Sequence, residues 1–211
     1  MAPHARTNRI SRRSWLLAGL AGPLFRAWGA EQLGVTFDGD NLHVAAPGLH
    51  FLTGKPLARL RNADTVVFVS QLTLLSDNRG TIFRQPARER LIVSYDLWEE
   101  RFAVTIPGAP VRTLSHLTAA QAESWCMENL AISALGLPPD RPFWLRFELR
   151  TAAQKDLSSL VGESGLSLSS VLIDVLSRRP GADDLYWTRT AGPLRLGDLP
   201  RAFTGRAKRN G

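Results

Sequence analysis

The stretch TVVFVSQLTLL, residues 65–75, is the strongest indication of the fold class of this chain. It is rich in β-branched and aromatic residues, and the turn-forming sequence DNRG, residues 77–80, follows closely. Side chains of a strand point alternately to its two faces. The stretch therefore predicts a long β-strand. One face would carry Val66, Phe68, Leu72 and Leu74, and the other Val67, Val69, Gln71, Thr73 and Leu75.

Residues 143–150 show a stricter alternation of apolar and other side chains. Such a pattern is typical of a strand that buries one face and exposes the other to water. We expect one set of side chains to point inward, namely Phe143, Leu145, Phe147 and Leu149. We expect the other set to face water, namely Trp144, Arg146, Glu148 and Arg150.

Two further segments have the pattern of hairpins. Residues 33–45 place alternating apolar residues on both sides of a turn that contains Asp38-Gly39. Residues 90–97 and 101–106 do the same around Trp98-Glu99-Glu100. Short strands at 185–190 and 194–196 are expected to close the sheet.

Three helices are expected between these strands. Thr118 and Gln121 form a capping box, which predicts a helix that runs to about residue 135 and stops at Gly136. A short helix is expected from Pro56 and another over residues 168–178. Because the strands come in runs and do not alternate with helices, the sequence predicts an α+β fold. We expect a single domain with a largely antiparallel β-sheet and two or three packed helices.

Length and composition exclude several classes of protein. The chain has 211 residues, of which 44% are hydrophobic, which suits one globular domain with its own core. It is too apolar for a disordered chain, and its one cysteine, Cys126, excludes a disulfide-stapled miniprotein. No apolar run reaches the roughly 18–20 residues of a membrane-spanning helix.

The positive charge of the chain is concentrated at its two ends. The formal net charge is +7, but residues 1–30 hold five arginines and residues 201–211 hold four basic residues, with no acidic residue in either segment. The chain between them keeps 17 of the 26 basic residues and all 19 acidic ones, so it carries −2. We therefore expect no nucleic-acid binding by the folded domain, and we expect residues 201–211 to form a flexible basic tail.

The amino terminus resembles an export signal. The sequence SRRSWLL, residues 11–17, resembles the twin-arginine signal, with Arg12 and Arg13 as the arginine pair. The apolar stretch 15–25 is long enough for a signal peptide and too short for a membrane anchor. Small residues place the cleavage site between Gly29 and Ala30. The alternative is an N-terminal amphipathic helix or a basic arm.

This resemblance divides the chain into three parts. A signal peptide would occupy residues 1–29, one α+β domain residues 30–200, and the basic tail residues 201–211. The mature protein would be periplasmic or secreted, with no transmembrane segment after removal of the signal.

Motifs for catalysis or cofactor binding are not found in the sequence. It contains no phosphate-binding glycine loop and no nucleophile-elbow motif. The histidines of the mature chain, His43, His50 and His116, do not lie at metal-ligand spacing from a cysteine. Cys126 lies beside Trp125 in a predicted helix and suits a small buried side chain better than a nucleophile. We therefore expect no catalytic residue, no metal and no cofactor.

One candidate binding surface is the hairpin tip around residue 98. Trp98 and Arg101 lie there beside Asp96, Glu99 and Glu100, and tryptophan and arginine next to charge are typical of recognition surfaces. The alternative is a turn that is simply solvated. A second alternative is a cofactor-independent hydrolase in which Asp96, with Glu99 or Glu100, meets a distant partner after folding.

A second candidate surface is the water-facing side of the strand 143–150. Trp144, Arg146 and Arg150 would face the same way there and could bind a ligand or a lipid headgroup. The alternative is a half-exposed strand that a helix covers.

The central hairpin resembles a known family. RLIVSYDL, residues 90–97, followed by RFAV, residues 101–104, resembles the Leu-Ser-Tyr-x-x-Leu…Tyr/Phe-x-Val segment of a family of exported bacterial proteins. That family is catalogued only as a domain of unknown function. The strand before the hairpin, the helix around Trp125, the strand 145–149 and Trp187 follow in a similar order. The family has no assigned catalytic residues, so the resemblance implies none here.

Taken together, the sequence favours an exported protein of the cell envelope that binds a partner and performs no catalysis. The expected partner is an envelope protein or a lipid.

Overall fold

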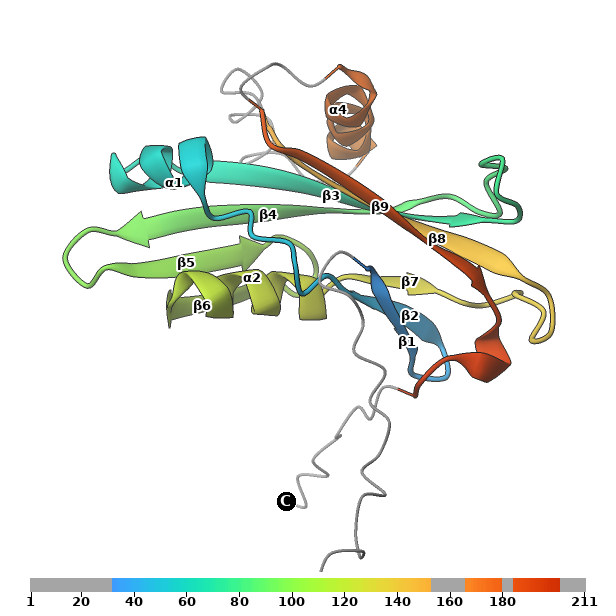
Figure 1. The fold of residues 1–211 in the computed structure, drawn as a ribbon. Helices are drawn as coiled ribbons and strands as arrows, with labels where there is room; N and C mark the ends of the chain where they lie inside the picture. Colours follow the sequence, from blue (N-terminus) through green and yellow to red (C-terminus); the bar gives the residue numbers. More distant parts are fainter. Residues whose placement is uncertain (1–31, 153–165, 180–183, 202–211) are drawn as a thin grey trace, which may run out of the picture.

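The computed structural model describes residues 32–152, 166–179 and 184–201 (Figure 1). Within these residues, helices and antiparallel strands form one body dominated by β-sheet, so the predicted α+β class is confirmed. The strands are β1 (Gly34–Phe37), β2 (Asn41–Ala45), β3 (Val66–Leu75), β4 (Ala87–Asp96), β5 (Arg101–Ile106), β6 (Arg112–Leu117), β7 (Ala131–Ser133), β8 (Phe143–Thr151) and β9 (Tyr186–Leu194). The helices are α1 (Gly54–Arg61), α2 (Ala119–Glu128) and α4 (Leu166–Ser177).

The strands form two antiparallel sheets. The large sheet has six strands in the order β6-β5-β4-β3-β8-β9, and the small sheet has the order β1-β2-β7. The stretch that predicts the fold class is β3, at the centre of the large sheet between β4 and β8. Figure 1 shows α2 and the small sheet on one side of the large sheet and α4 on the other. We call these sides the inner and the outer face.

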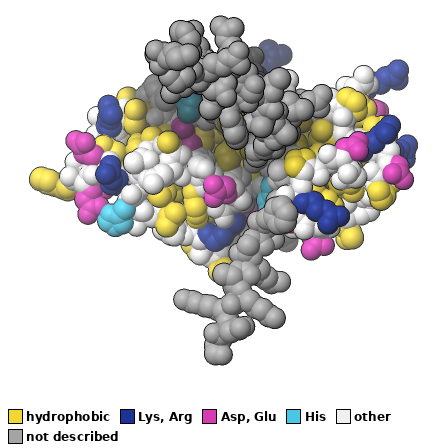
Figure 2. All heavy atoms as spheres, turned by 60° about the horizontal axis from the view of Figure 1, so that its bottom comes forward, with side chains coloured by type: hydrophobic (Ala, Val, Ile, Leu, Met, Phe, Trp, Pro, Cys, Tyr) yellow, Lys and Arg dark blue, Asp and Glu magenta, His cyan; other side chains and the backbone are white. Residues whose placement is uncertain are grey.

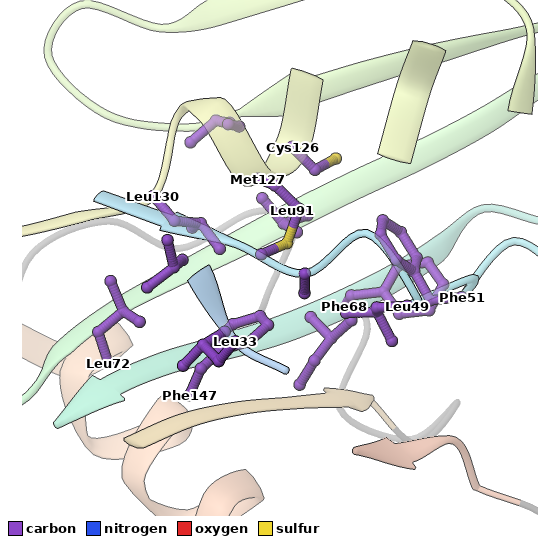
Figure 3. Packing of buried hydrophobic residues seen from close by; sticks show 14 of the residues in the cluster. Leu33, Leu49, Phe51, Phe68, Leu72, Leu91, Cys126, Met127, Leu130 and Phe147 are labelled. Atoms are coloured by element: carbon purple, nitrogen blue, oxygen red, sulfur yellow. The ribbon is translucent and has the colours of Figure 1, made fainter. Parts of the chain in front are cut away.

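The main core lies on the inner face of the large sheet. The predicted inward set of β8 and the predicted apolar face of β3 are both part of it, so these two inward faces are confirmed. The ring of Phe51, from the segment before α1, packs edge-on against Phe68 of β3 with 4.8 Å between centroids. Figure 3 shows Met127 of α2, Leu130 just beyond it and Leu33 among the side chains that fill this interior. Burial of this apolar surface is the main force that holds α2 and the small sheet against the large sheet.

A smaller apolar cluster lies on the outer face under α4. Val67 and Val69 of β3 pack there with Ala152, and α4 contributes Leu172 and Val175. Since β3 has apolar side chains on both faces, each face needs a cover, and α4 covers one end of the outer face.

The helix predicted from Thr118 forms, but its predicted end is wrong. The capping box is present, with the Gln121 N–H donating to the Thr118 side chain. The helix ends at Glu128, and the side chain of the C-cap residue Asn129 donates to the Trp125 carbonyl. The residues that follow form β7, whose Ile132 is buried opposite β2.

Two strands are absent from the prediction. β6 is the edge of the large sheet and β7 has three residues, so neither carries a clear alternation of its own. The two closing strands predicted at 185–190 and 194–196 are one strand, β9, followed by a 3-10 turn at Leu196–Asp198.

The export signal lies outside the described residues. This applies to Arg12 and Arg13, to the cleavage site at Gly29 and Ala30, and to residues 202–211 of the basic tail.

Candidate functional site

Trp98 stands at the tip of the β4–β5 hairpin and is almost completely exposed. Its relative exposure is 97%, and that of its neighbour Leu97 is 50%. Tryptophan is usually well buried, because its side chain is the largest apolar surface among the amino acids. An indole held in water at the end of a hairpin is therefore a strong candidate for a contact residue.

The backbone of this turn is held by Asp96. Its Oδ1 accepts hydrogen bonds from the Trp98 N–H at 2.8 Å and the Glu99 N–H at 3.0 Å. Glu100 closes the turn in the left-handed region, with a φ of 53°. The exposed indole therefore belongs to a turn whose backbone is held by hydrogen bonds.

Two contacts at the base of the turn hold it to the sheet. A Glu99 carboxylate oxygen lies 2.6 Å from His116 Nδ1 at the end of β6. Beneath them, the rings of Tyr95 and Phe102 are 4.8 Å apart at a tilt of 54°. Arg101, also exposed, reaches the Glu100 carbonyl at 3.5 Å. Trp98 and Arg101, both predicted as binding residues, lie on this one hairpin.

Acidic, basic and apolar side chains are mixed at this end of the molecule. Figure 2 shows them gathered, together with histidine, at the end that carries the β4–β5 turn in Figure 1. The backbone N–H groups of Glu99 and Trp98 lower the pKa of Asp96 from its usual range. A general acid at neutral pH needs a raised pKa, so the environment of Asp96 acts in the opposite direction.

The three other predicted binding residues lie on β8, and the structure separates them. Trp144 and Arg146 are half-buried on the outer face, and no described carboxylate pairs with Arg146. The prediction that Arg150 faces water is wrong, because this side chain is only 7% exposed and lies beneath the C-terminal end of α4. Its guanidinium donates to the carbonyls of Val175 at 3.0 Å and Arg178 at 2.9 Å. It therefore holds α4 on the sheet.

Each histidine of the described chain contacts a carboxylate. A hydrogen bond of 2.8 Å joins His43 Nε2 to Asp38, and one of 3.1 Å joins His50 Nδ1 to Glu123. The His43 contact and two backbone N–H groups hold the pKa of Asp38 well below its usual range. Over the described ranges, no group of three or more histidine, cysteine or acidic side chains could hold a metal ion.

Cys126 is expected to be unreactive in the folded protein. Burial, with a smaller contribution from the charge of Glu123, raises the pKa of Cys126 to about 12. Its thiol lies in the main core, so almost no thiolate is present near neutral pH and a reagent cannot reach it. Iodoacetamide at pH 8 should leave the native protein unmodified by mass spectrometry and should label it once in denaturant. Stoichiometric labelling of the native protein would contradict this packing.

Sequence patterns do not single out a second group of exposed apolar residues. Ile82 and Leu135 are 58% and 77% exposed, and they lie in the β3–β4 and β7–β8 connections, at the far end of the sheet from the β4–β5 turn. They are about fifty residues apart in sequence, so no local pattern joins them. The excess of arginine in the same two segments is the signal that could have drawn attention to them.

Comparison with known proteins assigns no family to this chain. No protein-family model matches the sequence, and neither a curated protein nor a solved structure shows significant similarity to it. None of the described helices is long and apolar enough to cross a membrane.

Proposed function

We propose that this protein is exported to the cell envelope and acts there as a non-catalytic binding module, with the β4–β5 turn as its contact element. The observation that carries the proposal is the 97% exposure of Trp98 on an ordered turn. Tryptophan is enriched among residues whose truncation weakens binding most. Because Asp96 already fixes the turn, little conformational freedom is lost when the indole is buried against a partner.

The chemistry around Trp98 favours a protein partner over a lipid surface. Asp96, Glu99 and Glu100 lie in the same turn as the indole, with Arg101 and His116 as the nearby basic groups. Carboxylates are repelled by anionic lipid headgroups and are costly to bring to a membrane interface. A protein with an apolar pocket and a basic rim would complement both the indole and the acidic groups.

Replacing Trp98 with alanine tests this contact. We expect binding of the exported protein to a solubilised envelope fraction to weaken tenfold or more, as is typical of a buried aromatic anchor. The free energy of unfolding should change by less than about 0.5 kcal/mol, because an exposed side chain contributes little to folding. Val111→Ala, at a residue that is 61% exposed beyond the other end of β5, is the matched control and should bind like wild type. Undiminished binding of Trp98→Ala would overturn the proposed contact.

The proposed location rests on the twin-arginine sequence. Cell fractionation of wild type beside the Arg12→Lys/Arg13→Lys double variant, with sequencing of the mature N-terminus, tests it. We expect a mature chain that begins near Ala30 outside the cytoplasm and is lost in the double variant. A full-length cytoplasmic protein in both strains would overturn the export proposal.

A further inference from the structure

The end of the large sheet opposite Trp98 is built from two segments that are distant in sequence. These are residues 76–88, from the end of β3 into β4, and residues 134–146, from the end of β7 into β8. We call them together the basic end. Arg84 joins them, because its guanidinium donates to the Ser133 carbonyl at 2.8 Å and also to the Leu135 carbonyl. In Figure 1 this end lies at the right and the β4–β5 turn at the left.

The basic end exposes several large apolar side chains. Leu135 is 77% exposed, Ile82 58% and Phe83 37%. Pairing of Leu75 with both Ile82 and Trp144 places these two side chains on the outer face, on either side of buried Leu75. A group of exposed apolar side chains at one end of a molecule marks an interaction site more often than scattered single ones do.

The same end carries a local positive charge. Its two segments contain five arginines and two aspartates, whereas the folded body as a whole is slightly negative. The neighbouring β1–β2 turn, whose Asp40 carbonyl accepts the Ala134 N–H, adds Asp38 and Asp40, so the arginines still outnumber the carboxylates. Arg79 and Arg141 are exposed, and no described carboxylate pairs with Arg146. The Asp77 carboxylate accepts hydrogen bonds from the Thr81 side chain and from backbone N–H groups of its own turn. Figure 2 shows basic side chains at this end, interspersed with apolar and some acidic ones.

We infer that the basic end contacts an anionic lipid surface. Arginines near a membrane are attracted to anionic headgroups, and exposed leucine, isoleucine and aromatic side chains lose contact with water at the headgroup boundary. The aliphatic side chains argue against nucleic acid, since Ile82 and Leu135 would stay in water on a phosphate backbone. This site is separate from the proposed Trp98 contact and does not depend on it. A chain bound to a membrane through the basic end would keep its Trp98 end free to meet a partner.

An environment-sensitive fluorophore at position 135 tests this inference in the full chain. Leu135→Cys offers an exposed thiol for labelling, while Cys126 is buried and should stay unlabelled. We expect the emission to shift to the blue with vesicles that contain phosphatidylglycerol and to stay unchanged with pure phosphatidylcholine vesicles. The same label at Trp98→Cys is the control for the opposite end and should remain in water. Because the readout is local, vesicle binding by another part of the chain does not imitate it.

A second experiment removes positive charge from the basic end. Arg79→Gln/Arg141→Gln in the labelled Leu135→Cys chain should weaken binding to phosphatidylglycerol vesicles by about tenfold or more at low salt. No shift at position 135, an equal shift with both kinds of vesicle, or a shift at position 98 alone would overturn the inference. A shift that needs an envelope protein and no lipid would also overturn it, because it would assign the basic end to a protein partner.

Discussion

Replacing Gly192 with alanine is expected to lower the free energy of unfolding by about 2–4 kcal/mol, because the added methyl group would overlap the Trp144 indole. Gly192 lies where β9 bulges opposite Trp144 of β8. A Cβ there would lie 2.6 Å from Trp144 Cγ and 2.9 Å from Nε1, and closer still to Cδ1. The φ of +147° at Gly192 is also one that other residues rarely adopt. Denaturant unfolding followed by circular dichroism measures the loss.

Two further variants separate steric overlap from backbone strain. Gly39 has a φ of +109°, and no atom lies within 4 Å of the place that a Cβ would take, so Gly39→Ala should cost only the backbone strain, about 1–2 kcal/mol. Adding Trp144→Ala to Gly192→Ala removes the overlap, and the double variant should be more stable than Gly192→Ala alone. A Gly192→Ala protein as stable as wild type would contradict the packing of Trp144 on β9.

Removal of the Glu123 carboxylate should destabilise the protein by about 2–3 kcal/mol, because it leaves a buried N–H group without its acceptor. Glu123 lies in α2 with 7% exposure. Its Oε1 accepts the Leu52 N–H at 2.8 Å, and its Oε2 lies 3.1 Å from His50 Nδ1. One side chain thus ties α2 to the segment that leads into α1. We expect Glu123→Ala to show this loss in denaturant unfolding.

Glu123→Gln and His50→Ala are the matched controls for the two contacts of the Glu123 carboxylate. Glutamine keeps an oxygen that can accept the Leu52 N–H, so Glu123→Gln should lose less than half as much stability as Glu123→Ala. The His50 side chain is 66% exposed, so His50→Ala should cost less than about 1 kcal/mol. Equal losses in Glu123→Ala and His50→Ala would show that the Leu52 contact contributes nothing.

The strands that are predicted correctly show an alternation of apolar side chains within their own sequence. β3 and β8 alternate over many residues, and both faces of each can be read from residues next to one another in sequence. β7 has three residues and exists because β2 pairs with it, a contact between segments about ninety residues apart. The end of α2 is missed for the same reason, since the pairing that replaces helix with strand is not local.

The candidate sites differ in the same way. Trp98 is found from sequence because a hairpin tip is a local feature, and polar neighbours mark it as a turn. Arg150 alternates with inward residues and therefore looks water-facing, but α4 comes back over it from later in the chain. The basic end is assembled by Arg84 across two distant turns, so no single stretch of sequence carries it.

Photo-crosslinking from position 98 in living cells tests most directly whether the β4–β5 turn is the contact element of a binding module. A benzophenone amino acid replaces Trp98 in the full chain, and Val111, also exposed, serves as the matched position. We expect a light-dependent adduct of one defined mass with an envelope protein from position 98 and none from position 111. No adduct from position 98, or the same adducts from both positions, would contradict this expectation.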